Sequence, residues 1–463
     1  MSGSTLIFFQ TYSRIEWAVD VGEEADIWPL TDDWPGIDQL RQNLVLKGVS
    51  VRVLEAGRFI DERVSLLREI LSAWGLRLSE LEVNGRTLRE TLEVGWPGMS
   101  GWWLSAFTER NPLKTDVFFR LAQLNAIEVQ LAPFQYKQMV LFVPRGDLHD
   151  ALARMAARHG VRVLPVEEVF RSNRLREVLV RCGSFAEAIV RLAQWLWAGF
   201  PFWLSARFGS VPREEAGRVL FLCYFPLLDR PAAMDGRFVN RFARPLQELM
   251  DQMRVPVEWL MMVVPFEGVG RWEAAALSKR LRKAGTRIRF LYEFLSVSLL
   301  HRVCQDFIQL FIRAAKALRQ MKPGTLSNGV CVPEGEVFLR RLWERSFSGW
   351  VCLEGLLYLR LFEKIFQSSS GLNGCLYFAE MQVWEKALNA ARHEKAPSVR
   401  TIGFQHAAVS RNHFFYRMDP KNETTLRQSA SHLLPDVLAV NGRRFKNSSE
   451  IQGLVDVRSV EAV

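Results

Sequence analysis

The chain lacks the sequence motifs of several common enzyme classes. It contains no GxxxxGK[ST], no HExxH and no GxSxG pattern, which argues against a P-loop ATPase, a zincin and an α/β-hydrolase. Gly268 and Gly270 resemble the start of a dinucleotide fingerprint, but the third glycine is missing. The sequence also has no internal repeat and no low-complexity block. Function therefore has to be sought outside these patterns.

Cysteine is scarce, with six residues among 463. None form a CxxC pair, and no histidine pairs with them at metal-ligand spacing, so neither a disulfide framework nor a metal cofactor is expected. The apolar run from Leu6 to Phe9 is too short for the core of a signal peptide. Together these features predict a cytoplasmic protein whose cysteines are reduced core residues.

No apolar run in the chain clearly reaches the ~20 predominantly apolar residues that a membrane-spanning helix needs. The strongest candidate, 186–208, is interrupted by Glu187, Arg191 and Arg207, and Pro201 breaks its helical period. Its many aromatic side chains, flanked by arginine, are typical of an element at a membrane interface. We therefore consider peripheral contact with an anionic membrane at the inner face of the cytoplasmic membrane. The alternative is a buried helix pair packed in the core.

Positive charge exceeds negative charge, with 60 Lys and Arg against 50 Asp and Glu and a formal net charge of +10. The basic residues are scattered and form neither a tail nor a run. A solvated, ion-paired surface is the first interpretation of this excess. Binding of phosphates or of an anionic membrane face is the second, and nucleic acid is a distant third, so no nucleic-acid partner is predicted.

The chain is 49% hydrophobic and 24% charged, as expected for a globular protein with a sizeable core. Short apolar runs alternate with segments of helical period, which predicts an α/β protein with parallel sheets. Strands are expected at 5–9, 49–54, 127–131, 139–143, 161–164, 219–225, 257–264, 288–292, 375–378, 399–404 and 436–440. Helices are expected at 61–74, 115–126, 148–159, 242–253, 272–284, 294–321, 334–347, 352–366 and 384–392.

The length and the order of these segments predict several regions. Residues 1–180 form an N-terminal α/β region, and residues 181–215 form an aromatic helical insert or linker. A Rossmann-like domain follows at 216–442. Residues 443–463 read as a linker or as the start of a further domain.

Three short apolar runs between residues 374 and 442 end in polar residues that can do chemistry. The residues concerned are Glu380 after the first run, Gln405 and His406 after the second, and Asn441 and Gly442 after the third. Ligands of open α/β sheets lie outside the carboxyl ends of the strands, so this pattern predicts a binding cleft. His406 could act as a base or donate to a phosphate, or it could be a capping or core histidine. Glu380 could act as a base toward a sugar hydroxyl, or it could be an acid favoured at a helix N-terminus.

A second polar cluster follows the Trp pair at 102–103. It consists of Ser105, Glu109, Arg110 and Asn111. Arg110 could bind a phosphate. The alternative is a salt-bridged loop with the two tryptophans packed beneath it.

Several of these segments, taken in order, carry a family resemblance. They are WWLSAFTERN at 102–111, VEWLMMVVP at 257–265, FAEMQVWEKALNAA at 378–391, IGFQHAAVS at 402–410 and LPDVLAVNG at 434–442. The chain resembles bacterial surface-carbohydrate (O-antigen) biosynthesis proteins, a glycosyltransferase-like group of GT-B architecture. More remotely, the order of Glu380, Gln405-His406 and Asn441-Gly442 is similar to that of capsule-type Kdo transferases, sialyltransferases and glycerophosphotransferases.

The resemblance implies two Rossmann-like domains facing a cleft, a nucleotide-sugar donor, a saccharide or lipid-linked acceptor and no required metal. It implies His406 and Glu380 as the residues that deprotonate the acceptor hydroxyl. The implied substrate contacts are Gln405, Gly403, Asn441, Gly442, Arg110, Asn111, Glu109, Ser105 and Trp384.

In GT-B enzymes a full donor-binding domain follows the strand that ends in Asn-Gly. Here 21 residues follow Gly442 (463 − 442), whereas a Rossmann-like half needs ~100 or more. The resemblance therefore predicts an incomplete or missing C-terminal half, with residues 216–442 as the acceptor domain. The alternative function is a non-catalytic acceptor-binding or scaffold fragment that lacks the donor domain.

Overall fold

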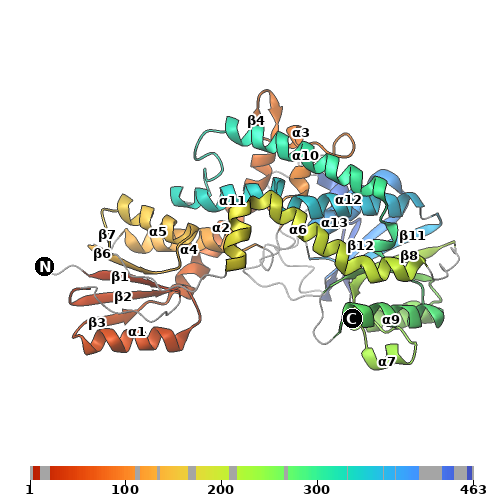
Figure 1. Cartoon of the computed structure of the whole chain (residues 1–463), viewed down its shortest axis with the longest axis horizontal. Helices are drawn as coiled ribbons and strands as arrows, with labels where there is room; N and C mark the ends of the chain where they lie inside the picture. The colour runs from red at the N-terminus through yellow and green to blue at the C-terminus, as the bar shows by residue number, and fades with distance from the viewer. Residues whose placement is uncertain are drawn as a thin grey trace. The chain divides into compact units, whose positions relative to one another are not determined.

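The computed structural model divides the chain into two compact units, which we describe one at a time (Figure 1). The residues that the structure describes are 4–10, 21–109, 115–132, 136–164, 174–207, 216–264, 269–330, 332–368, 370–380, 382–405, 430–442 and 456–460. Unit 1 comprises Met1–Trp74, Pro112–Arg181 and Met321–Leu342. Unit 2 comprises Gly75–Asn111, Cys182–Gln320 and Trp343–Val463. Each unit is therefore assembled from three separate segments of the chain.

Unit 1 is built on a five-stranded sheet with the order β3-β2-β1-β6-β7. Its strands are β1 (Thr5–Phe9), β2 (Glu24–Pro29), β3 (Ser50–Val53), β6 (Gln138–Phe142) and β7 (Arg162–Leu164). Every neighbouring pair is parallel. The central strand β1 is buried along its whole length, because its apolar side chains meet covered surfaces on both faces. Strand order reverses between β1 and β6, as in a Rossmann-type half.

The helices of unit 1 include α1 (Trp34–Leu46), α4 (Val117–Leu131) and α5 (Asp147–Arg158). Helix α1 begins where the Asp33 carboxylate accepts a hydrogen bond from the backbone N–H of Gly36 (3.2 Å). The boundary between the two units falls within two further helices, α2 (Ala56–Ser79) and α11 (Glu336–Phe347). Neither β2 nor α1 was expected from the sequence patterns.

The strand expected at 127–131 is wrong, because these residues form the last turns of α4. Leu121, Leu124, Ile127 and Leu131 are all buried at helical spacing. The β-branched residues made the segment look like a strand, but the apolar period of 3.6 residues continues through it and decides the outcome.

Unit 2 is built on a seven-stranded sheet with the order β10-β9-β8-β11-β12-β13-β14. Its strands are β8 (Arg218–Phe225), β9 (Val257–Val263), β10 (Ile288–Phe290), β11 (Leu372–Phe378), β12 (Arg400–Phe404), β13 (Val437–Asn441) and β14 (Asp456–Val460). All neighbouring pairs are parallel. The α/β class with parallel sheets is therefore confirmed in both units.

Unit 2 also contains helices. The longer ones are α8 (Arg244–Gln252), α9 (Arg271–Lys283), α10 (Val297–Gln320), α12 (Trp350–Ser368) and α13 (Val383–Lys395). Shorter elements are β4 (Glu82–Val83), β5 (Arg86–Thr87), α3 (Leu88–Thr91), η1 (Gly101–Leu104), α7 (Arg230–Met234), η2 (Leu291–Phe294), η3 (Pro333–Gly335, in unit 1) and η5 (Ser431–Leu433). One core joins Phe221, Trp259, Phe290 and Phe378 across four strands of the sheet. Strand β14 pairs with β13, so the final described residues extend this same sheet.

Residues 181–207 of the aromatic segment expected at 181–215 lie in helix α6 (Arg174–Arg207), and the remainder lies outside the described residues. The helix continues through Pro201, and the backbone departs from helical geometry at Gly183 instead, where φ is 77°. Trp195 and Trp203 pack against the core of unit 2, whereas Trp197 is 59% exposed. Among the described helices, none is long and apolar enough to cross a membrane. Membrane contact through this helix stays a prediction.

One histidine of unit 2 gives the fold a pH dependence. Burial, and then the charges of His393 and Arg89, lower the pKa of His432 from 6.5 to about 4. Its Nε2 is buried and has no hydrogen-bond partner among the described residues. Protonation therefore favours the unfolded chain, and stability present above pH 6.5 is lost as the pH falls toward 4.

We expect the free energy of unfolding to fall by about 2 kcal/mol between pH 7 and pH 5 through His432 alone. Substituting His432→Asn removes this component, and denaturant titrations at the two pH values measure the difference. His301→Asn, at an exposed position on α10, serves as the matched control and leaves the pH dependence intact. An unchanged slope in His432→Asn would refute the assignment.

Candidate functional site

The three polar strand ends predicted from the sequence lie side by side in unit 2. Strands β11, β12 and β13 are adjacent and parallel, with Phe378 opposite Phe404 and Phe404 opposite Ala439. The residues that follow, Glu380, Gln405 and Asn441, therefore share the carboxyl edge of one sheet. The structure thus places the three strand ends side by side, while the binding cleft expected there stays a prediction.

Glu380 occupies the most informative place at this edge, because strand order reverses between β11 and β8. In sheets of this kind ligands bind at the reversal point, outside the carboxyl ends of the strands. Glu380 is half-buried there. Gln382 donates a side-chain hydrogen bond to the Glu380 carboxylate and another to the Tyr224 hydroxyl at 3.2 Å. Tyr224 comes from the carboxyl end of β8, so the cluster spans both sides of the reversal.

The loop that carries Glu380 is held by the first turn of α13. The Glu385 carboxylate accepts hydrogen bonds from the backbone N–H groups of Glu380 (2.8 Å) and Gln382 (2.9 Å). This is a capping box in which residue N3 satisfies otherwise unpaired donors at the helix start. Glu385 is thus a positioning residue, and it fixes the backbone from which Glu380 projects.

The Tyr224 phenol is held in its protonated form. Burial raises its pKa well above the ordinary value, and the negative charges of Glu380 and Glu385 raise it further. Tyr224 therefore supplies a hydroxyl that can donate to a ligand oxygen, next to a carboxylate that can accept a proton. A protonated donor beside a carboxylate suits a hydroxyl-bearing ligand better than a phosphate.

Two residues predicted as substrate contacts, Trp384 and Gly403, make close packing contacts in the structure, and their contact with substrate stays a prediction. Trp384 is buried, donates to the Gln382 side-chain oxygen (3.1 Å) and lies edge-on to Tyr224 at 6.4 Å. It supports the two polar side chains that line the edge. Gly403 lies inside β12, where an added Cβ would come within 3.1 Å of the Ala379 Cβ and 3.3 Å of the Tyr377 ring. Its small size permits this close approach.

Gln405 and Asn441 are brought together at the β12–β13 edge. The Gln405 side-chain oxygen accepts a hydrogen bond from the backbone N–H of Asn441 (3.3 Å), and the backbone N–H of Gln405 donates to the Ala439 carbonyl (2.9 Å). Gly442 follows with φ at 77°, a conformation that glycine adopts at little cost. Gln405 therefore orders the end of β13, and Asn441 remains half-buried at the sheet edge.

The polar cluster near the Trp pair also belongs to unit 2. Lys386 of α13 donates to the carbonyl oxygen of Thr108, and Gly355 lets Leu104 pack closely against α12. Ser105 and Glu109 are both buried. The structure therefore brings the segment up to Glu109 alongside α13, the helix whose first turn holds the Glu380 loop.

Three predicted site residues, His406, Arg110 and Asn111, lie outside the residues that the structure describes. Their roles stay predictions. His406 directly follows Gln405 in the chain.

Sequence reasoning missed Tyr224, Gln382, Glu385 and Lys386. Tyr224 stands near the end of a continuous apolar run and could have been found by the strand-end rule applied to Glu380. The spacing of Gln382 and Glu385 fits a capping box and predicts the helix start. No local signal pointed to Lys386, because its partner Thr108 is distant in sequence.

The described residues contain no group of three or more His, Cys, Asp and Glu side chains that could hold a metal ion. No family model matches the chain, no curated protein matches it, and no solved structure matches it. The chemistry of the site therefore has to be argued from its own geometry.

Proposed function

We propose that this protein is a glycosyltransferase-like enzyme of GT-B type that acts in the assembly of bacterial surface polysaccharide. The observation that carries the proposal is the position of Glu380 at the strand-order reversal of unit 2, beside the protonated Tyr224. Such a pair can bind a sugar hydroxyl and take its proton.

The architecture supports the proposal at a coarser level. Each unit contains a parallel sheet whose strand order reverses next to its first strand. GT-B enzymes have two Rossmann-like sheets. We propose that the sheet of unit 1 is one of the pair and that of unit 2 the other.

The chemistry of the edge favours an acceptor role for unit 2. The β8–α7 connection, Pro226 to Asp229, has no glycine and thus lacks the turn that cradles a pyrophosphate. In the proposed reaction the Glu380 carboxylate takes the proton of the acceptor hydroxyl. The hydroxyl oxygen bonds to the anomeric carbon, the bond to the phosphate breaks, and the nucleotide leaves with its electron pair.

Glu380→Gln tests this role. We expect the turnover of the full chain to fall by about 100-fold or more, because a positioned base contributes 10²–10⁴-fold. The assay measures nucleotide released from a panel of nucleotide sugars in the presence of lipid-linked saccharides from bacterial membranes. The melting temperature should stay unchanged, because glutamine can still accept from Gln382.

The matched control is Glu248→Gln, an exposed carboxylate on α8 that pairs only with Arg244 among the described residues. It should leave turnover unchanged. Undiminished release in Glu380→Gln would remove the catalytic assignment. Saccharide binding by the wild-type chain without nucleotide release from any donor would favour the alternative, a non-catalytic acceptor-binding or scaffold protein.

A further inference from the structure

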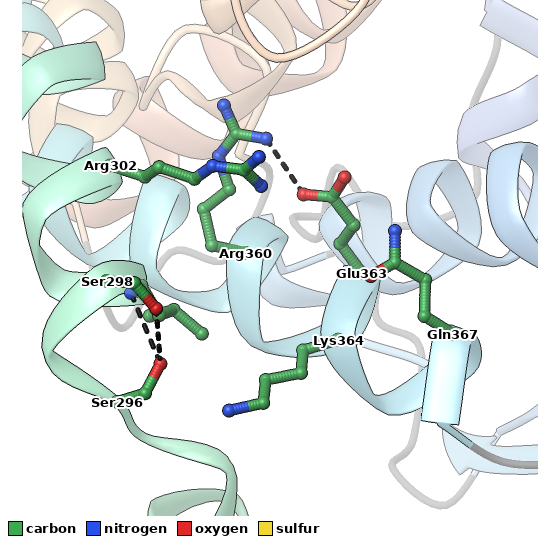
Figure 2. A pocket seen from close by; sticks show the side chains of 8 residues that line it. Ser296, Ser298, Arg302, Arg360, Glu363, Lys364 and Gln367 are labelled. Atoms are coloured by element: carbon green, nitrogen blue, oxygen red, sulfur yellow. Dashed lines mark hydrogen bonds and ion pairs between the residues drawn. The ribbon is translucent and has the colours of Figure 1, made fainter.

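A cavity of about 350 Å³ lies between α10 and α12 of unit 2, and none of the strand-end residues lines it (Figure 2). One wall is Ser296, just before α10, together with Ser298 and Arg302 of that helix. The other wall is α12, with Arg360 and Lys364 among its lining residues. Its volume falls at the lower end of the 300–1,000 Å³ range of small-ligand sites.

The carboxylates near the cavity are already neutralised. Asp306 is bound by Arg360 through two contacts of 2.7 and 2.8 Å. Glu363 accepts from Arg360 at 2.8 Å and lies 3.4 Å from the Lys395 ammonium. These two acids and two bases cancel in charge, and each of the two acids has a basic partner.

Arg302 and Lys364 also line the cavity and take no part in these ion pairs. Among the described residues neither of them forms an ion pair or a hydrogen bond. They approach the cavity from opposite walls, one from α10 and the other from α12 (Figure 2). The charge of Arg302 also acts on Asp306, but no ion pair within the described part of the chain holds either cation. Two such cations in a concave site attract a dianion, and both side chains can bind phosphate oxygens.

The rest of the lining selects among phosphate-bearing ligands. The hydroxyls of Ser296 and Ser298 lie 3.1 Å apart and can each bind a further ligand hydroxyl, and the Gln367 amide offers both a donor and an acceptor. No aromatic ring is among the described residues that line the cavity, so a nucleobase would find nothing to stack on. The lining therefore matches a small polyhydroxylated phosphate.

We propose that this cavity binds a monosaccharide phosphate, with the phosphate between Arg302 and Lys364 and the sugar hydroxyls on the serines and Gln367. This site is separate from the Glu380 edge. The inference does not depend on the proposed transferase activity, because it rests on the cavity and its charge balance alone.

Calorimetric titration of the full chain tests the proposal with ribose-5-phosphate, glucose-6-phosphate and glucose-1-phosphate. We expect at least one of them to bind more tightly than inorganic phosphate, and unphosphorylated glucose not to bind. The double variant Arg302→Gln/Lys364→Gln should weaken that binding about tenfold or more, since it removes two charge-assisted contacts. Both positions lack ion pairs in the described structure, so the variant should keep the wild-type melting temperature.

The matched control is Lys279→Gln/Lys283→Gln on α9, which removes the same charge from exposed positions outside the cavity. It should retain wild-type affinity. The proposal is overturned if no sugar phosphate binds, if binding survives the cavity variant, or if both double variants lose affinity equally. Tighter binding of adenosine monophosphate than of every sugar phosphate would overturn the ligand class.

Discussion

Replacing Gly199 by alanine destabilises unit 2 by about 3 kcal/mol, at the upper end of the range for overpacked cores. Gly199 lies in α6 where the helix crosses the ring of Tyr292, and an added Cβ would lie 2.0 Å from the nearest ring carbon. Contacts between carbon atoms are favourable at about 3.5–4.0 Å, so ring and helix have to separate. Alanine's better helix propensity, about 1 kcal/mol, does not offset this.

The Tyr292 ring has little room to give way. It is 3% exposed, and its centroid lies 4.4 Å from that of Trp195 and 6.4 Å from that of Phe202. The expected loss corresponds to a fall in melting temperature of roughly 5 °C for a unit of this size. Differential scanning calorimetry of the full chain measures it.

Gly57→Ala is the matched control, because a Cβ added to this helical glycine of α2 would have no other atom within 4 Å. It should be neutral or stabilise by up to about 1 kcal/mol. Adding Tyr292→Leu to Gly199→Ala should cost less than the sum of the two single changes, since the clash disappears with the ring. Additive losses in the double variant, or wild-type stability of Gly199→Ala, would show that a clash with the Tyr292 ring does not determine the stability at this position.

The same crossing illustrates what the sequence could predict about α6. Its aromatic content was visible, but two roles were compatible with it, burial and membrane contact. The structure assigns individual residues, with Trp195 against Tyr292 and Trp197 exposed. Neither the position of Tyr292 nor the close approach at Gly199 has a local signature, because the two residues are 93 positions apart (292 − 199).

Strands buried on both faces were the most predictable elements. The runs at 5–9 and 219–225 correspond to β1 and β8, since continuous apolar sequence has few alternatives in a parallel sheet. Glu380 could be placed at a strand end for the same reason. Its neighbours Tyr224 and Gln382 meet only through the strand order, which local sequence does not encode. The grouping of 75–111 with unit 2 likewise depends on tertiary contacts.

Arg218→Met is expected to destabilise the protein by about 3–5 kcal/mol. Arg218 begins β8 with only 1% of its surface exposed. Its guanidinium donates to Glu258 at 2.7 Å and to the Ser370 carbonyl at 2.8 Å. Methionine fills much of the space but leaves a buried carboxylate, for which Arg289 at 3.7 Å is a poor substitute.

Most of the expected cost comes from leaving the Glu258 carboxylate buried without its partner, and less from the lost hydrogen bonds of Arg218. A double substitution separates the two contributions. Arg218→Met/Glu258→Leu removes both charges and should recover most of the stability, because an apolar pair of similar volume often replaces a buried ion pair at little cost. Denaturant unfolding of the three proteins measures the coupling. The exposed pair Arg237–Asp235 supplies the control, since Arg237→Met should change stability by less than about 0.5 kcal/mol. A double variant as unstable as Arg218→Met would mean that the hydrogen bond to Ser370, at the turn into β11, carries the stability instead.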